Sequence, residues 1–169
     1  GAAGVLHRFM AIDMQIEKAR EIEKRSGKCY VAIGLQDYRE RVMYLSPHAT
    51  LFMLDSANGS NILVENFIRW YKEEGFPQDI VIGNTLTKAS VSRAINLGAD
   101  AMRHGIGIGK ACLTTDITGI GCPPVTALYY GWKAIRNHEL ENKDIGFEHD
   151  SNLNSPTLLL DGGIRKPGD

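Results

Sequence analysis

Residues 49–84 decide the fold class, and they read ATLFMLDSANGSNILVENFIRWYKEEGFPQDIVIGN. The stretch opens and closes with continuous apolar runs, ATLFML and DIVI, which are typical of strands buried on both faces. The sequence between them, NILVENFIRWYKEE, has apolar residues at helical spacing and is followed by Gly75, a common helix terminator. A buried strand, an amphipathic helix and a second buried strand predict a parallel βαβ unit.

The same alternation extends to both sides of this unit. Glycines and polar residues follow each expected strand, which is where barrels and doubly wound sheets carry their functional groups. Strand ends rich in glycine and polar groups, after strands that are not, favour a barrel with its site at the carboxyl ends of the strands, although periodicity alone leaves an open sheet as an alternative. Further helices are expected at 12–27, 38–45, 87–98 and 123–137, further strands at 29–34, from 99 into the glycines and at 157–163, and the strand-end motifs are HRF, GLQD, DSANG, GNT, HGIGIG and DGGIR.

The composition argues against several classes of protein. The 169 residues suffice for one domain, and a net charge of −1 gives no basic footprint for nucleic acid or for a membrane surface. No apolar run approaches the roughly 20 residues that span a bilayer, and no secretory signal is visible. Cys29, Cys112 and Cys122 form no CxxC pair, which disfavours a disulfide scaffold or zinc site and predicts a cytoplasmic thiol protein.

Residues 105–122, GIGIGKACLTTDITGIGC, admit three chemistries. A P-loop fails because Ala111 stands where the magnesium-binding hydroxyl is needed, and a dinucleotide fingerprint fails because Lys110 stands where its third glycine is needed. The third chemistry is nucleophilic: Cys112 follows an expected strand end, and nearby Lys110 could favour its thiolate. An inert cysteine beside a tight turn is the alternative, and the local sequence leaves both open.

These residues and the other strand ends, taken together, resemble one family. GIGIGKACLTTDITGIGCPP is similar to the catalytic loop of the inosine monophosphate dehydrogenase and guanosine monophosphate reductase family, and HRF, LDSANG, IGN and LLLDGGIRKPGD fall in that family's order. The resemblance implies a (β/α)8 TIM barrel, an α/β fold, of which residues 1–169 would form a single partial catalytic domain with strands two to seven. A longer chain or a partner would then complete the barrel.

The resemblance also implies the ligands: a purine nucleoside monophosphate as substrate, NADPH or NAD as cofactor, and K+, in a homotetramer. Cys112 would attack purine C2, and Thr114 would assist the leaving ammonia or an attacking water. The implied substrate-binding residues are Asn84, Arg103, Lys110, Asp161, Gly162 and Gly163; the implied cofactor-binding residues are Arg8, Asp55, Ser56, Ala57, Ile106 and Gly107; and the carbonyls of Gly107, Gly109 and Cys112 would hold the monovalent cation.

Several of these residues also have plain structural interpretations. Asp55 could cap a helix, Asn84 could occupy a turn, and Arg8 and Arg103 could be ordinary charges at a barrel rim. His104 departs from the small apolar residue usual before the glycines. Residues 137–156 are polar and acidic, and we expect a surface loop or a lid there.

The direction of the implied reaction is the last expectation. HRF, DSANG and Lys110 resemble the reductases, which favours NADPH-dependent conversion of GMP to IMP and ammonia. FMAIDMQIEKARE and Arg103 resemble the dehydrogenases, so IMP dehydrogenase is the alternative. A non-catalytic protein that binds purine nucleotides is a further one.

Overall fold

The computed structural model describes residues 4–106, 121–144 and 156–160, and within them strands and helices alternate as the sequence predicts. The expected helices at 12–27, 38–45 and 87–98 and the expected strands are confirmed to within a few residues. The strands are β1 (Val5–Leu6), β2 (Tyr30–Ile33), β3 (Leu51–Asp55), β4 (Asp79–Thr85), β5 (Ala101–His104) and β6 (Thr157–Leu160), and the helices are α1 (Ile12–Ser26), α2 (Tyr38–Leu45), α3 (Ile62–Glu73), α4 (Lys88–Asn96) and α6 (Pro124–Asp144).

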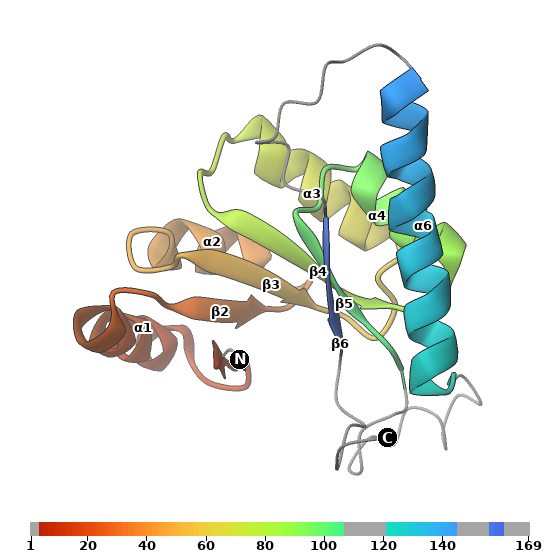
Figure 1. Cartoon of the computed structure of the whole chain (residues 1–169). Helices are drawn as coiled ribbons and strands as arrows, with labels where there is room; N and C mark the ends of the chain where they lie inside the picture. Colours follow the sequence, from red (N-terminus) through yellow and green to blue (C-terminus); the bar gives the residue numbers. More distant parts are fainter. Residues whose placement is uncertain (1–3, 107–120, 145–155, 161–169) are drawn as a thin grey trace.

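The strand order identifies the sheet as part of a barrel. The six strands are parallel and pair in the order β1-β2-β3-β4-β5-β6, so each strand lies beside its neighbour in sequence. A doubly wound sheet would reverse its order at a switch point, and this sheet does not. The sheet is curved, and the helices follow its outer side (Figure 1). The fold is therefore a partial (β/α)8 barrel, as expected, and the open-sheet alternative is wrong.

Strand side chains alternate between two apolar layers. Phe52, Leu54, Ile80 and Ile82 are fully buried in the main core, together with side chains of the helices. The alternate residues of the same strands form a second, smaller cluster on the other face of the sheet, made of Met53, Val81 and Ala101 with Val5 and Leu51 packed against it. This period of two is what parallel strands with both faces covered require. It leaves the last residues of each strand for polar functions.

Small residues allow α6 to pack close to the sheet. Ala127, Gly131 and Ala134 recur along one side of this helix, and both alanines are fully buried. A Cβ atom placed on Gly131 would lie 2.7 Å from Cδ1 of Leu158 and 3.0 Å from Nε2 of His104. Glycine at this position therefore sets the distance between α6 and the strands β5 and β6.

The expected loop at 137–156 is wrong in its first part, because α6 continues to Asp144. The segment 137–144 lacks apolar periodicity, which led to its assignment as a loop, but it contains no glycine or proline to stop the helix. Arg136 and Glu139 also form an ion pair at 3.3 Å, with the i,i+3 spacing that supports a helix. Residues 145–155 lie outside the described ranges, so a lid there stays an expectation.

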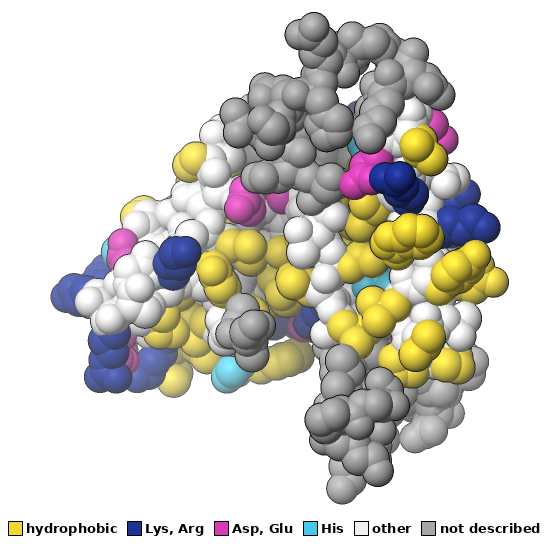
Figure 2. Space-filling model, viewed as in Figure 1, with side chains coloured by type: hydrophobic (Ala, Val, Ile, Leu, Met, Phe, Trp, Pro, Cys, Tyr) yellow, Lys and Arg dark blue, Asp and Glu magenta, His cyan; other side chains and the backbone are white. Residues whose placement is uncertain are grey.

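The outward side of α6 also carries apolar side chains. Figure 2 shows hydrophobic side chains gathered over this part of the molecule. A helix that is apolar on opposite sides is normally covered on both of them. The exposed residues of this patch are Val125, Leu128, Tyr129, Tyr130, Trp132 and Leu140.

None of the helices in the described ranges combines the length and apolar character that a membrane crossing requires.

Candidate active site

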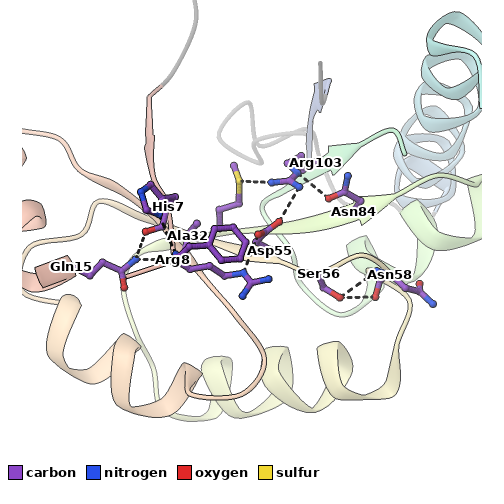
Figure 3. A network of polar contacts seen from close by, with 11 residues as sticks. His7, Arg8, Gln15, Ala32, Asp55, Ser56, Asn58, Asn84 and Arg103 are labelled. Carbon is purple, nitrogen blue, oxygen red and sulfur yellow. Dashed lines mark hydrogen bonds and ion pairs between the residues drawn. The ribbon is translucent and has the colours of Figure 1, made fainter. Parts of the chain in front are cut away.

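Four residues that the sequence singles out meet at the carboxyl edge of the sheet. Asp55 ends β3, Asn84 lies near the end of β4, and Arg103 precedes the last residue of β5. Arg8 comes from the segment that follows β1. Because all the strands are parallel, these ends share one edge, and the four side chains form a continuous polar group (Figure 3).

Asp55 lies between two arginines. Its Oδ2 accepts a hydrogen bond from Nε of Arg8 at 3.0 Å, and its Oδ1 is 2.9 Å from a terminal nitrogen of Arg103. Each carboxylate oxygen thus faces a different guanidinium group, and the three side chains carry a net charge of +1. The helix-capping interpretation of Asp55 is wrong, because the side chain of Asn61 caps α3 by accepting from the backbone N–H of Leu63.

Two glycines flank Asp55 and make room for the arginines. Gly83 is the partner of Asp55 in the register of β3 and β4, and a Cβ atom on it would lie 2.9 Å from Cβ of Arg103. Gly34 follows β2, and a Cβ atom there would lie 3.3 Å from a terminal nitrogen of Arg8. Our sequence reasoning missed this role, although the pattern was present: the two glycines stand at the ends of the strands on either side of β3, in GLQD and IGN.

Asn84 connects Arg103 to the start of the glycine-rich segment. Its Oδ1 accepts from Nε of Arg103 at 2.9 Å, and its Nδ2 donates to the carbonyl of Gly105 at 2.7 Å. Asn84 is also buried, so these two bonds occupy both ends of a side-chain amide that water scarcely reaches. The interpretation of Asn84 as a simple turn residue does not account for this pair of contacts.

The DSANG turn is fixed to the end of β4. The backbone N–H of Ser56 donates to the carbonyl of Gly83, and that of Gly59 donates to the carbonyl of Asn84, at 2.9 Å and 2.8 Å. A Cβ atom on Gly59 would approach this same carbonyl oxygen to 2.9 Å, so only glycine fits there without a shift. Ser56 directs its hydroxyl at the carbonyl of Asn58, and Ala57 is exposed.

His104 occupies a fully buried position that joins three elements. Its Nδ1 is 2.8 Å from Oγ1 of Thr85, and its Nε2 is 2.8 Å from the carbonyl of Ala127 in the first turn of α6. The carbonyl requires a donor, which places the proton on Nε2 and leaves Nδ1 to accept from the threonine hydroxyl. Burial lowers the pKa of His104, and the bond to Ala127 opposes this more weakly. The departure that the sequence shows at this position is thus a buried link between β4, β5 and α6.

The remaining predicted site residues lie outside the described ranges. The register nevertheless fixes where the chain enters their segments, because His104 pairs with Leu160 on the adjacent strand. His104 and Leu160 are the last residues of their strands, and the sequence continues from them into Gly105 and Asp161. The residues concerned are Gly107, Gly109, Lys110, Cys112, Thr114, Asp161, Gly162 and Gly163, while Ile106 is described and half-buried.

A singly wound parallel sheet with its polar groups collected at the carboxyl ends of the strands is the arrangement of a (β/α)8 barrel. Comparison with known proteins specifies it further, because the model of the IMP dehydrogenase / GMP reductase domain matches residues 1–169. The chain belongs to this family.

Similar proteins carry the name inosine-5′-monophosphate dehydrogenase. The chain is 31% identical to the one from Rhodopirellula baltica over 161 residues, which cover 94% of this chain and 27% of that protein. It is 31% identical to the one from Methanocaldococcus jannaschii over 149 residues, 86% of this chain and 27% of that protein. The chain thus spans less than a third of the length of these relatives.

The two glycines provide a matched test of the site geometry. Gly83→Ala should destabilise the protein by about 1–3 kcal/mol, because its new methyl group meets the backbone-near Cβ of Arg103. Gly34→Ala should cost clearly less, because the nearest atom belongs to the movable end of Arg8. Urea unfolding measures both. Equal losses in the two variants would contradict this account of the packing.

The burial of His104 predicts a pH dependence of stability. Because the folded state lowers the pKa of this imidazole, the unfolded chain binds its proton more readily, and the free energy of unfolding should fall as pH drops through about 6.5. His104→Gln, which can still donate and accept, should show a shallower fall over the same range. Urea titrations at several pH values compare the two proteins, and parallel pH profiles would contradict the assignment.

Proposed function

We propose that the protein is a nicotinamide-dependent oxidoreductase that acts at C2 of a purine nucleoside monophosphate. One observation supports this proposal: the last residues of β5 and β6, His104 and Leu160, pair with each other, and the cluster of Arg8, Asp55 and Arg103 lies at these same carboxyl ends of the strands. Cys112 as nucleophile and Asp161 as nucleotide-binding carboxylate belong to the sequence that continues from these two strands, and together with a charged cluster they would suit this chemistry.

The described residues fit the cofactor. A carboxylate can accept hydrogen bonds from ribose hydroxyls, and guanidinium groups suit phosphates, so Asp55 and Arg8 offer complementary contacts to a dinucleotide. Ser56, Ala57, Ile106 and Gly107 complete the proposed cofactor site. When bound, the nicotinamide supplies or takes up the hydride of the reaction. The substrate would lie against Asn84, Arg103, Lys110, Asp161, Gly162 and Gly163.

Cys112 performs the covalent step in this proposal. Its thiolate adds to C2 of GMP, and the bond between C2 and the exocyclic nitrogen breaks, so that ammonia leaves with a proton delivered by way of Thr114. The hydride that a bound reduced nicotinamide would supply to C2 would then let Cys112 leave as the thiolate and release IMP. The carbonyls of Gly107, Gly109 and Cys112 would hold a K+ ion in this loop, and a homotetramer would be the working assembly.

The reductase direction is the first candidate, with NADPH as the hydride donor. Arg8 of HRF and Asp55 of DSANG, the two reductase-like motifs, form a direct ion pair. The dehydrogenase direction, from IMP to XMP with NAD, is the second candidate. It is favoured by the names of the similar proteins and by Arg103, which contacts the same carboxylate.

The direction can be tested with the full-length protein. Consumption of reduced nicotinamide is followed by its near-ultraviolet absorbance with GMP and NADPH, and its formation is followed with IMP and NAD. We expect turnover in the first assay. Asp55→Asn should raise the KM for the cofactor by roughly tenfold, because one charge-assisted contact is lost. Turnover only in the second assay would overturn the reductase direction, and nucleotide binding without turnover in either would favour a non-catalytic protein.

Cys112 should be the reactive thiol among the three cysteines. Cys29 is fully buried, and burial together with the nearby Glu23 carboxylate raises its pKa, so it should react slowly. Cys122 is half-buried and serves as the internal control. Iodoacetamide labelling with mass-spectrometric mapping should modify Cys112 first, and purine monophosphate should protect it. Faster labelling of either other cysteine would reject the nucleophile assignment.

A further inference from the structure

A buried polar network lies beneath the segment that carries Arg8. Gln15 lies on α1, and its polar side chain is fully buried on the same helix face as Ala19. Its Nε2 donates to the carbonyl of His7 at 3.1 Å and to the carbonyl of Ala32 at 2.9 Å, as Figure 3 shows. One amide group therefore joins α1, β2 and the segment after β1.

Arg41 of α2 completes this network from the other side. It is 8% exposed, and its guanidinium donates to Oε1 of Gln15 and, at 3.0 Å, to the carbonyl of Met10. Its Nε donates to Oδ2 of Asp37 at 2.6 Å, so the buried charge is paired. Every polar atom of the Gln15 amide thus has a partner, and two helices share the contacts.

The carbonyls that the network holds lie on either side of Arg8. His7 accepts from Gln15 and Met10 accepts from Arg41, so the short stretch between them is fixed at both ends. Strand pairing cannot do this, because β1 pairs with β2 only through Val5 and Leu6. Side chains from α1 and α2 replace the backbone ladder that ends at Leu6.

The stretch held in this way presents two side chains at the carboxyl edge. Arg8 reaches Asp55, and its guanidinium lies over the ring of Phe9, 4.4 Å from the ring centre. Phe9 is 73% exposed, so this pair faces outward from the sheet edge. The position of both side chains depends on the backbone between His7 and Met10.

We propose that Gln15 and Arg41 are positioning residues for cofactor binding, which they promote by fixing the backbone on both sides of Arg8. Neither residue is among those proposed to bind a ligand, and both would act through the direction in which Arg8 meets Asp55. This inference rests on the proposed function, since it assigns Arg8 to the cofactor. A buried amide and a buried guanidinium are costly compared with apolar side chains, which fits a role in geometry more than in stability.

A merely structural role would link α1 to α2 without changing cofactor binding, and Gln78 supplies the matched control. Its Nε2 donates to the carbonyl of Ser46 at 2.8 Å, and its backbone carbonyl accepts from the hydroxyl of Tyr71. Gln78 directly precedes β4, so it lies at the amino ends of the strands, away from Arg8. Gln78→Met and Gln15→Met therefore remove similar bonds at opposite edges of the sheet.

The experiment measures KM for the cofactor and for the purine nucleotide in the full-length protein, together with the melting temperature. Gln15→Met should raise the cofactor KM by roughly tenfold and leave the nucleotide KM within about twofold, since one precisely held contact is misplaced. Gln78→Met should lower the melting temperature with neither KM changed. In an Arg8→Ala background, Gln15→Met should add nothing further to the cofactor KM, because its effect passes through Arg8.

Three outcomes would overturn the inference. If the wild type is active and Gln15→Met and Gln78→Met have the same cofactor KM, the positioning role is rejected, while the proposed function is not. Additive effects of Gln15→Met and Arg8→Ala would do the same. Absence of any turnover in the wild type would reject the proposed function, and the inference with it. If Gln15→Met does not fold, Arg41→Lys keeps the charge but loses the forked contacts, and the same criteria apply to it.

Discussion

The parallel order of the strands is the constraint on which the rest of the structure depends. Six strands that all run the same way place every carboxyl end at one edge, so residues from distant parts of the sequence meet there without any long loop. Asp55 and Arg103 are 48 positions apart in the chain and yet form an ion pair at 2.9 Å. The alternating apolar side chains of the strands can then all pack in the core, because the polar side chains of the site come from the last one or two residues of each strand.

The cluster around Asp55 is better explained by recognition than by stability. The side chains of Arg8, Asp55 and Arg103 are 35%, 20% and 25% exposed, and ion pairs that water reaches to this extent contribute only about 0–1 kcal/mol each. Their geometry is nevertheless closely determined, since Gly83 and Gly34 leave the space and Asn84 holds Arg103 from the side. A group that adds little stability and is still held from several directions fits the cofactor-binding role proposed for it.

The sequence predicted the helices and strands well because their signals are local. The helix expected at 87–98, for example, begins after Thr87, which caps it in a reciprocal capping box with Ser90. The loop expected from residue 137 is wrong up to Asp144, because the weak apolar periodicity of this segment did not indicate that the helix continues. The candidate site residues in the described ranges came from the resemblance, and composition or spacing alone would not have selected them.

What the sequence could not give depends on contacts between separate elements. Gln15 occupies a buried position of α1, and the sequence of this helix does not show that Arg41 of another helix donates a hydrogen bond to it. The same holds for Gly83, whose importance lies in the arginine on the next strand. His104 was noticed only as a departure from a pattern, and its partners Thr85 and Ala127 lie 19 and 23 positions away.

The two ends of the segment that carries Cys112 are attached to the same small group of residues. At its start, Gly105 donates its N–H to the carbonyl of Thr85 and accepts from Asn84. Beyond its end, α6 is attached through the bond between Ala127 and His104, which itself contacts Thr85. The bonds that begin the segment and the bond that anchors the following helix therefore belong to one buried unit. A change at the end of β4 would therefore reach both attachments at once, and it would also reach the Asp55 cluster, because Asn84 holds Arg103, which pairs with Asp55.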